Sequence, residues 1–126
     1  MANWRPAISS AQKIKECSSG QAPQLEFTEN VDILAPVAQS PAAQAGQLFC
    51  VGFAAESHDV EQHAEAKRRR KKLPLIIANR AQDTFAQDEN EVILLDDDGA
   101  HPWPRMDKLA LARRLIAEIA ERLERR

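Results

Sequence analysis

The chain of 126 residues contains four glycines and no glycine-rich phosphate loop. None of the four stands in GxGxxG or GxxxxGK spacing, which excludes the common motifs that bind phosphate through a glycine-rich turn. The GxSxG and HExxH patterns of serine hydrolases and zinc peptidases are absent as well. A functional site must therefore be sought in other patterns of the sequence.

Cysteine and long apolar runs are also scarce. The two cysteines, Cys17 and Cys50, form neither a disulfide framework nor a metal-binding pattern. Cys50 lies in an apolar run and is expected to be buried, whereas Cys17 is expected in an exposed loop. No run approaches the roughly 18 apolar residues of a membrane span, and the first residues lack the apolar core of a signal peptide. These features predict a cytoplasmic protein without a membrane partner.

Acidic and basic residues are almost balanced, with a formal net charge of −2. A general nucleic-acid binder usually has an overall basic surface, so nucleic acid is an unlikely partner. A local basic site remains possible, because the field at a site depends on where the charges lie. Six consecutive cations at 67–72 are the candidate for such a site.

The centre of the chain predicts a βαβ unit. Residues 47–55 and 73–78 are short apolar runs typical of strands buried on both faces. The segment between them begins with Ser57 as a candidate helix cap and ends with the cations of 67–72, which suit the negative end of a helix. Strand, helix and strand in about 30 residues indicate a partly parallel sheet and the α/β class.

The remaining elements are expected on either side of this unit. Alternation at 25–29 predicts a half-buried strand, and 31–38 a short helix capped by Asn30. Residues 91–104 suggest a hairpin whose turn contains Asp96, Asp97, Asp98 and Gly99.

A C-terminal amphipathic helix is expected from Asp107 onward. Its predicted core-facing stripe has a spacing of three and four residues and consists of Leu109, Ala112, Ile116, Ile119 and Leu123. The residues expected to face water are Arg113, Arg114, Glu118, Glu121 and Arg122. Alternatively, this stripe packs against a helix of a partner protein.

No metal site is predicted. His58 and His63 are five residues apart, roughly on opposite faces of a continuous helix, and the three aspartates of the hairpin turn lack the spacing of a calcium loop. The cations of 67–72 have three interpretations: a solvated helix end, a nucleic-acid patch or a small-polyanion site. Phe53 and Asn79, near the ends of the two predicted strands, favour a nucleotide, because open α/β sheets bind ligands at that edge.

Several segments resemble the phosphopantothenate–cysteine ligase family in order along the chain. They are 2–6 (Ala-Asn-Trp-Arg-Pro), 12–15 (Gln-Lys-Ile-Lys), 30–34, 51–57 (Val-Gly-Phe-Ala-Ala-Glu-Ser), 64–71, 75–79 (Leu-Ile-Ile-Ala-Asn) and 88–93, with Lys108 before the last helix. In bacteria this ligase is commonly the C-terminal half of a bifunctional coenzyme A biosynthesis flavoprotein. The resemblance implies a partial Rossmann-like sheet with flanking helices and a homodimer or larger oligomer.

The resemblance also implies an activity. Family members use CTP and Mg²⁺ to activate the carboxylate of 4′-phosphopantothenate as an acyl-cytidylate, and the amine of cysteine then displaces CMP. Attack of a carboxylate on a triphosphate joins two anions, so cations are needed to stabilise the developing charge.

The implied nucleotide-binding residues are spread over much of the chain. They are Asn3, Lys13, Val31, Asp32, Ile33, Leu34, Phe53, Lys67 and Lys71, with Ala54, Ala55 and Asn79 shaping the pocket. Phe53 would lie against the cytosine, and Lys13 and Lys67 would stabilise charge. The segment from Lys67 onward would act in part as a mobile flap, with its arginines as solvated neighbours.

The chain departs from the family pattern in several places. Asn3, Pro74 and Arg80 stand where aspartate is usual, and the resemblance implies a first half of the domain, with a glycine-rich segment, that residues 1–126 do not contain. Residues 1–126 are therefore interpreted as the C-terminal portion of a ligase domain, and catalysis by this chain alone is not expected. The alternatives are a non-catalytic module that binds a nucleotide or polyanion, and a fragment whose one activity is self-association.

Overall fold

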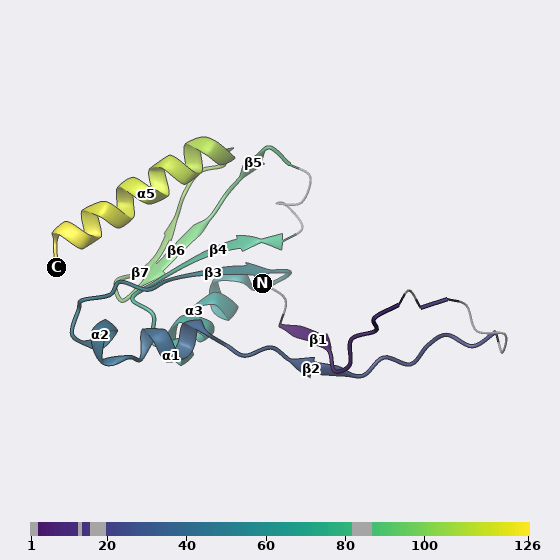
Figure 1. Ribbon diagram of the computed structural model, residues 1–126. Coiled ribbons are helices and arrows are strands. Elements are labelled where there is room, and N and C mark those ends of the chain that lie inside the picture. Colours follow the sequence, from purple (N-terminus) through teal and green to yellow (C-terminus); the bar gives the residue numbers. More distant parts are fainter. Residues whose placement is uncertain (1–2, 13, 16–19, 82–86) are drawn as a thin grey trace. The chain divides into compact units, whose positions relative to one another are not determined.

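The computed structural model describes residues 3–12, 14–15, 20–81 and 87–126 (Figure 1). It consists of two compact units, Met1–Asp32 and Ile33–Arg126, which we call the first and the second unit. Among the described residues, none of the helices is long and apolar enough to cross a membrane.

The first unit contains a two-stranded antiparallel sheet formed by β1 (Trp4–Pro6) and β2 (Phe27–Glu29). Arg5 donates from Nη1 to Oδ1 of Asn30 at 3.0 Å, and the backbone N–H of Asn30 donates to the carbonyl of Asn3 at 2.8 Å. Asn30 therefore closes this two-stranded sheet. The prediction that Asn30 caps a helix is wrong. The strand predicted at 25–29 is confirmed for its last three residues.

The second unit has a four-stranded sheet in the order β3-β4-β6-β7. The strands are β3 (Val51–Glu56), β4 (Leu75–Arg80), β6 (Ile93–Asp96) and β7 (Gly99–Pro102). β3 and β4 are parallel, and the other pairs are antiparallel. The helix α3 (Val60–Lys71) connects β3 to β4, so the predicted βαβ unit is confirmed. The predicted hairpin is confirmed as β6 and β7, with Gly99 at a φ of 120° beside the turn.

Side chains alternate between the two faces of this sheet. One face packs against α3 and α1 (Leu34–Ala38) through a cluster that includes Ala54, Ala64 and Ile76. The other packs against the C-terminal helix α5 (Lys108–Glu124) through a cluster that includes Leu75, Ile77 and Leu94. The unit is therefore layered, with helices on both faces of a mixed sheet, as Figure 1 shows.

Gly52 of β3 packs closely against the side chains of Leu73, just before β4, and Ile76, within β4. A Cβ at this position would lie 2.7 Å from Cδ1 of Leu73 and 3.2 Å from Cγ1 of Ile76. These separations are shorter than ordinary van der Waals contact, so the close packing of this strand requires glycine.

The helix starts differ from those expected. α1 begins at Leu34, three residues after the predicted start at Val31, and its N-cap residue, Ile33, makes no side-chain capping bond. α3 begins at Val60 after Asp59, whose backbone is left-handed (φ 44°, ψ 48°), so Ser57 does not cap it. The remaining elements are α2 (Pro41–Gln44), capped by Ser40, and the strand pair β5 (Glu89–Asn90) and β8 (Met106–Asp107).

The predicted helix at the C-terminus is confirmed, but the stripe expected to face the core is wrong. Leu111 and Leu115 are buried, and Ile119 packs beside them. Leu109, Ile116 and Leu123 are instead 60%, 67% and 49% exposed. Asp107 caps the helix by accepting from the backbone N–H groups of Leu109 and Ala110, which fixes where the helix begins.

Candidate functional site

The parallel strands β3 and β4 end together at what we call the carboxyl edge, formed by Glu56, Asn79 and Arg80. Pairing in register places Ala55 beside Asn79 and Glu56 beside Arg80. β3 is one of the two outer strands of the sheet in the described part of the chain. The carboxyl ends of parallel strands are the usual location of ligand sites in open α/β sheets.

Phe53 is the exposed aromatic residue of this region. It lies in the middle of β3 with 72% of its surface exposed, although its neighbours Gly52 and Ala54 are buried. Alternation along the strand places Phe53 on the same face as Val51, which packs with the cluster beneath α5. An exposed phenyl ring on an outer strand provides an apolar surface on which a flat ring can stack.

Lys67 and Glu56 form an ion pair that joins α3 to the end of β3. The Glu56 side chain is 13% exposed, and its second oxygen lies 3.9 Å from Nδ1 of His63. Lys67 projects toward the start of its helix, as long side chains on helices do, and so reaches the carboxyl edge. Because Glu56 follows Ala54 in the strand pattern, this ion pair lies on the α3 face of the sheet.

A cavity of about 210 Å³ lies beside the end of β4 and the start of β6. Asn79, Arg80 and Trp103 are among its lining residues. Trp103 is half-buried, and the guanidinium of Arg114 stacks on its ring at 4.2 Å from the centroid. Asn79 thus lies in a hollow at the carboxyl edge, while the Arg114 side chain, expected to face water, covers an aromatic ring.

The six cations of 67–72 do not form one patch. Residues 67–71 are the last part of α3, and the expectation that the arginines are solvated neighbours is wrong for Arg68, which is 6% exposed. Arg68 donates from Nη1 to Oδ1 of Asp97 at 2.9 Å and to the carbonyl of Leu73 at 3.1 Å. It also forms two bonds with Glu65, so its guanidinium fixes the end of the helix against the hairpin turn.

These bonds shift the ionisation of both partners. The hydrogen bond from Arg68 is the largest cause that lowers the pKa of Glu65 to about 2, against the opposing effect of burial, and Arg69 adds a second bond. The bond to Glu65 in turn raises the pKa of Arg68 above its usual range. The pair is therefore charged at every pH at which the protein is expected to work.

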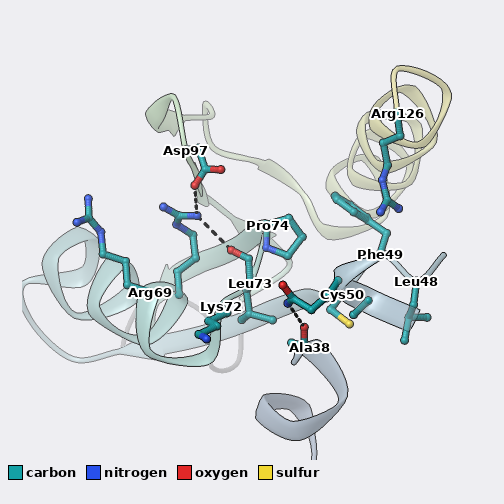
Figure 2. A pocket seen from close by; sticks show the side chains of 13 residues that line it. Ala38, Leu48, Phe49, Cys50, Arg69, Lys72, Leu73, Pro74, Asp97 and Arg126 are labelled. Atoms are coloured by element: carbon teal, nitrogen blue, oxygen red, sulfur yellow. Dashed lines mark hydrogen bonds and ion pairs between the residues drawn. The ribbon is translucent and has the colours of Figure 1, made fainter. Parts of the chain in front are cut away.

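A larger cavity, of about 580 Å³, lies at the opposite edge of the sheet, where β3 and β4 begin (Figure 2). We call it the amino-edge pocket. Arg69 and Lys72 from the end of α3 and Arg126 from the end of the chain provide its positive charge. The Arg126 guanidinium lies over the ring of Phe49 at 5.1 Å, and Cys50 is buried beneath, as the sequence predicts.

A buried network around Asp96 was not foreseen. The carboxylate accepts from Nη1 of Arg122 at 2.8 Å and from the backbone N–H of Asp98 at 2.9 Å, and lies 3.0 Å from Nε2 of His101. Burial alone would raise the pKa of Asp96, but the bonds from His101 and Arg122 outweigh it and lower the pKa. The aspartates form the predicted turn, and the first of them also anchors α5.

The predicted nucleotide-binding residues fall into both units. Asn3, Val31 and Asp32 are exposed in the first unit, and Lys13 lies outside the described residues. In the second unit, Ile33 is 62% exposed at the start of α1, and Leu34 packs against the core.

Within the second unit, the structure brings some of the predicted residues together and separates others. Asn79 and Ala55 lie side by side at the carboxyl edge, whereas Ala54 is 4% exposed and packs in the core. Lys71 lies in the last turn of α3, which has run back to the amino edge, so it is not placed beside Asn79. Phe53 and Lys67 are on opposite faces of β3.

The expectation that His58 and His63 face opposite sides of a helix is wrong. His58 lies in the turn before α3, and the centroids of the two rings are 4.9 Å apart. With Asp59 they form a group whose potential ligand atoms lie within 4.8 Å of one another. Spacing along the sequence misjudged this pair because the helix begins two residues after His58.

The mixed sheet with helices on both faces defines the second unit as a mixed α/β domain. The chain belongs to the family described as "DNA/pantothenate metabolism flavoprotein C-terminal domain", whose sequence model matches residues 1–123. This assignment confirms the resemblance drawn from the sequence segments.

Curated relatives extend well beyond this chain. The coenzyme A biosynthesis bifunctional protein CoaBC of Vibrio cholerae is 36% identical over 126 residues, which is 98% of this chain and 31% of that protein. The protein of the same name from Escherichia coli K12 is 37% identical over 128 residues, again with 98% and 31% coverage. The chain therefore spans about a third of the length of these relatives.

Solved structures show the same fold. A crystal structure of the C-terminal domain of coenzyme A biosynthesis bifunctional protein CoaBC aligns with a TM-score of 0.70 and 26% identity, covering 100% of this chain and 52% of that one. The DNA/pantothenate metabolism flavoprotein of Streptococcus pneumoniae aligns with a TM-score of 0.64 at 17% identity, covering 83% and 44%. The second likeness concerns the fold alone.

Proposed function

We propose that this chain supplies part of the nucleotide site of a CTP-dependent ligase that joins 4′-phosphopantothenate to cysteine in coenzyme A biosynthesis. The observation that carries the proposal is the family match over residues 1–123, together with relatives named for coenzyme A biosynthesis. Further support comes from the exposed ring of Phe53 on β3 and from Lys67 and Asn79 at the carboxyl edge.

In this proposal the cytosine base stacks on Phe53. The ring is exposed, the strand beneath it is rigidly packed, and the small side chain of Ala55 on the same face leaves room for the ribose. Stacking of a base on an aromatic side chain contributes about 1–3 kcal/mol and does not by itself distinguish bases. Preference for cytosine over adenine must then come from hydrogen bonds to the edge of the base.

The phosphates pass around the end of β3 toward Lys67. Without nucleotide, Glu56 holds the ammonium of Lys67 in an ion pair. A phosphate oxygen can compete for this ammonium, because charge-assisted bonds to phosphate and to carboxylate are of similar strength. Glu56 therefore keeps the lysine in place before the nucleotide arrives.

Mg²⁺ fits this site as an ion carried mainly by the triphosphate. Mg²⁺ keeps several waters and is commonly held by one or two carboxylates with the substrate phosphates. Glu56 is the carboxylate of the carboxyl edge, and its pairing with Lys67 leaves it little capacity as a ligand. The ion would neutralise charge on the phosphates, while Lys67 would stabilise the charge that develops when the substrate carboxylate attacks.

The proposed nucleotide site also includes residues of the first unit. Asn3, Lys13, Val31 and Asp32 are assigned to the nucleotide by the family resemblance. The small-molecule substrates, 4′-phosphopantothenate and cysteine, and assembly as a homodimer rest on the same basis.

Titration of isotope-labelled protein with CTP or ATP in the presence of Mg²⁺, followed by NMR, tests the proposal. We expect the backbone signals of 53–56 and 79–80 to shift with CTP and to shift less with ATP. Equal shifts with both nucleotides would contradict CTP selectivity. No shifts in these segments at millimolar CTP would contradict the site itself.

A second candidate function is supported by the amino-edge pocket. Arg69, Lys72 and Arg126 surround a cavity of about 580 Å³, which suits a small polyanion bound without catalysis. Such binding would weaken steeply with salt and would not select among nucleotides. In the NMR titration it would shift the signals of 68–74 and leave those of 53–56 in place.

A further inference from the structure

The turn between β3 and α3 gathers three side chains that are all good ligands for a transition metal. His58, Asp59 and His63 each offer one atom, and these atoms lie within 4.8 Å of one another. The two imidazole rings meet edge to face, with an angle of 87° between their planes. None of these three residues is assigned to the proposed nucleotide site, although His63 lies 3.9 Å from Glu56, the carboxylate that pairs with Lys67.

The backbone explains how residues five apart come together. Asp59 adopts a left-handed conformation (φ 44°, ψ 48°), which turns the chain sharply before the first helical residue, Val60. His63 occupies the first turn of α3, and its backbone N–H donates to the carbonyl of Asp59 at 2.9 Å. His58 is therefore folded back over the start of the helix, toward His63.

Neighbouring groups act on both imidazoles. Oγ of Ser57 lies 2.9 Å from Nδ1 of His58, and a proton on Nδ1 donated to this hydroxyl leaves the lone pair of Nε2 for a metal. Nδ1 of His63 lies 3.9 Å from the carboxylate of Glu56, which is too long for a hydrogen bond, so the negative charge of Glu56 acts on this ring only through space. Metal-bound histidines usually donate their second N–H to a hydrogen-bond partner, which fixes the ring and raises its basicity.

We propose that His58, Asp59 and His63 form a binding site for a divalent transition-metal ion of the zinc class. Two imidazole nitrogens and one carboxylate oxygen suit Zn²⁺, Co²⁺ or Ni²⁺, whereas Mg²⁺ and Ca²⁺ prefer sites made of oxygen atoms alone.

The distances are within reach of coordination. Ligand atoms about 2.0–2.2 Å from a tetrahedral zinc ion lie roughly 3.3–3.5 Å from one another. The ligand atoms here need to move together by little more than an ångström, and His58 and Asp59 are exposed and His63 half-buried, so side-chain rotation suffices.

The charges of the surroundings also suit a cation. Asp59 carries a negative charge at the site, and Glu61 lies in the first turn of the same helix. The positive charge of Lys67 is already compensated by Glu56. Three protein ligands leave one position of a tetrahedral ion for water, and an ion held in this way would brace the turn between β3 and α3.

Calorimetric titration of the full chain with ZnCl₂, after removal of metal with EDTA, tests this proposal. All variants carry Cys17→Ser, so that this thiolate does not compete for the ion. We expect binding of one equivalent, an affinity lower by about tenfold or more in His58→Ala and in His63→Ala, and no binding in the double variant. Co²⁺ should give the visible absorption of a four-coordinate site in the parent and not in the double variant.

The third histidine of the chain provides a matched control. His101 lies on β7 and pairs with Asp96, away from the turn before α3, so His101→Gln should bind Zn²⁺ as the parent does. Circular dichroism should show the same helix content in all variants, because the replaced imidazoles of His58 and His63 are not core residues. Undiminished binding in the double variant, an equal loss in His101→Gln or no binding by the parent would overturn the proposal.

Discussion

Arg122 of α5 donates from Nη1 to Oδ2 of Asp96 at 2.8 Å and so joins the C-terminal helix to the end of β6. Asp96 is largely buried, with 9% of its side chain exposed, and Arg122 is 21% exposed. The same carboxylate also accepts from the backbone of Asp98 and pairs with His101. One residue of the hairpin turn thereby fixes both the turn itself and the helix that covers this face of the sheet.

Replacing Asp96 should destabilise the fold strongly. Asp96→Ala leaves the guanidinium of Arg122 without its largest partner, and breaking a buried pair in this way costs about 3 kcal/mol in the free energy of unfolding. Urea denaturation followed by circular dichroism measures the change. Asp98→Ala, which removes an exposed carboxylate from the same turn, should change stability by less than about 0.5 kcal/mol.

A double-mutant cycle isolates the pair. Arg122→Ala combined with Asp96→Ala should cost less than the sum of the two single changes, because neither partner is then left buried alone. Additive costs would show that the two residues do not stabilise each other.

Glu65 predicts how stability depends on pH. Its pKa in the folded protein, about 2, lies below its ordinary value of 4.5, so the unfolded chain takes up a proton before the folded one does. The stabilisation is complete above about pH 4.5 and is lost as pH falls toward 2. Glu65→Gln should therefore be less stable than the parent at neutral pH, with a difference that shrinks across this range.

Urea unfolding at a series of pH values between neutral and 2 measures this effect. Glu61→Gln, an exposed position in the first turn of the same helix, is the control and should keep the pH dependence of the parent. A difference between Glu65→Gln and the parent that stays constant with pH would contradict the assignment.

The buried face of α5 can be tested with two adjacent residues. Leu115 is 8% exposed and Ile116 is 67% exposed. Leu115→Ala should reduce the free energy of unfolding by about 2–4 kcal/mol, because it opens a cavity beneath the helix. Ile116→Ala should change it by less than about 0.5 kcal/mol. A larger loss of stability in Ile116→Ala than in Leu115→Ala would show that the face expected from the sequence pattern is the buried one.

Gly52 should not tolerate a methyl group. Gly52→Ala places Cβ 2.7 Å from Cδ1 of Leu73, and such overpacking costs about 1–3 kcal/mol. Thermal denaturation should show a lower midpoint for this variant. Adding Leu73→Ala removes the clash, so the double variant should lose less stability than the sum of the two single changes.

Substitutions of Lys67 and Lys72 distinguish CTP binding at the carboxyl edge from CTP binding at the amino-edge pocket. If the phosphates of CTP reach the carboxyl edge, Lys67→Gln should weaken CTP binding by about tenfold, the loss of one charge-assisted bond. Lys72→Gln at the amino-edge pocket should leave it unchanged. Equilibrium binding of labelled CTP measures both, and a larger effect of Lys72→Gln would favour the polyanion function.

The local sequence pattern predicted those elements in which hydrophobicity and turn residues agree. The two apolar runs became β3 and β4, and Asp107 starts α5 because its carboxylate meets two free backbone N–H groups. The buried face of α5 was not predictable from periodicity, since both Leu115 and Ile116 belong to apolar stripes. The tertiary bond from Arg122 to Asp96 selects between them.

The candidate site was predictable in its residue types more than in its geometry. Asn79 lies near the end of β4 as expected, whereas Phe53 lies in the middle of β3. The division of the cations was not predictable. Arg68 is buried and bonds to Asp97, which is 29 positions away and reaches it only in the folded hairpin.

The proposed function depends most on the stacking of a cytosine nucleotide on Phe53 of β3. Its most direct test is the calorimetric affinity for CTP with Mg²⁺ of Phe53→Leu, compared with Phe49→Leu at the amino-edge pocket. Loss of one aromatic stacking partner, about 1–3 kcal/mol, predicts at least about fivefold weaker binding for Phe53→Leu and no change for Phe49→Leu. Unchanged CTP affinity in Phe53→Leu would contradict the claim.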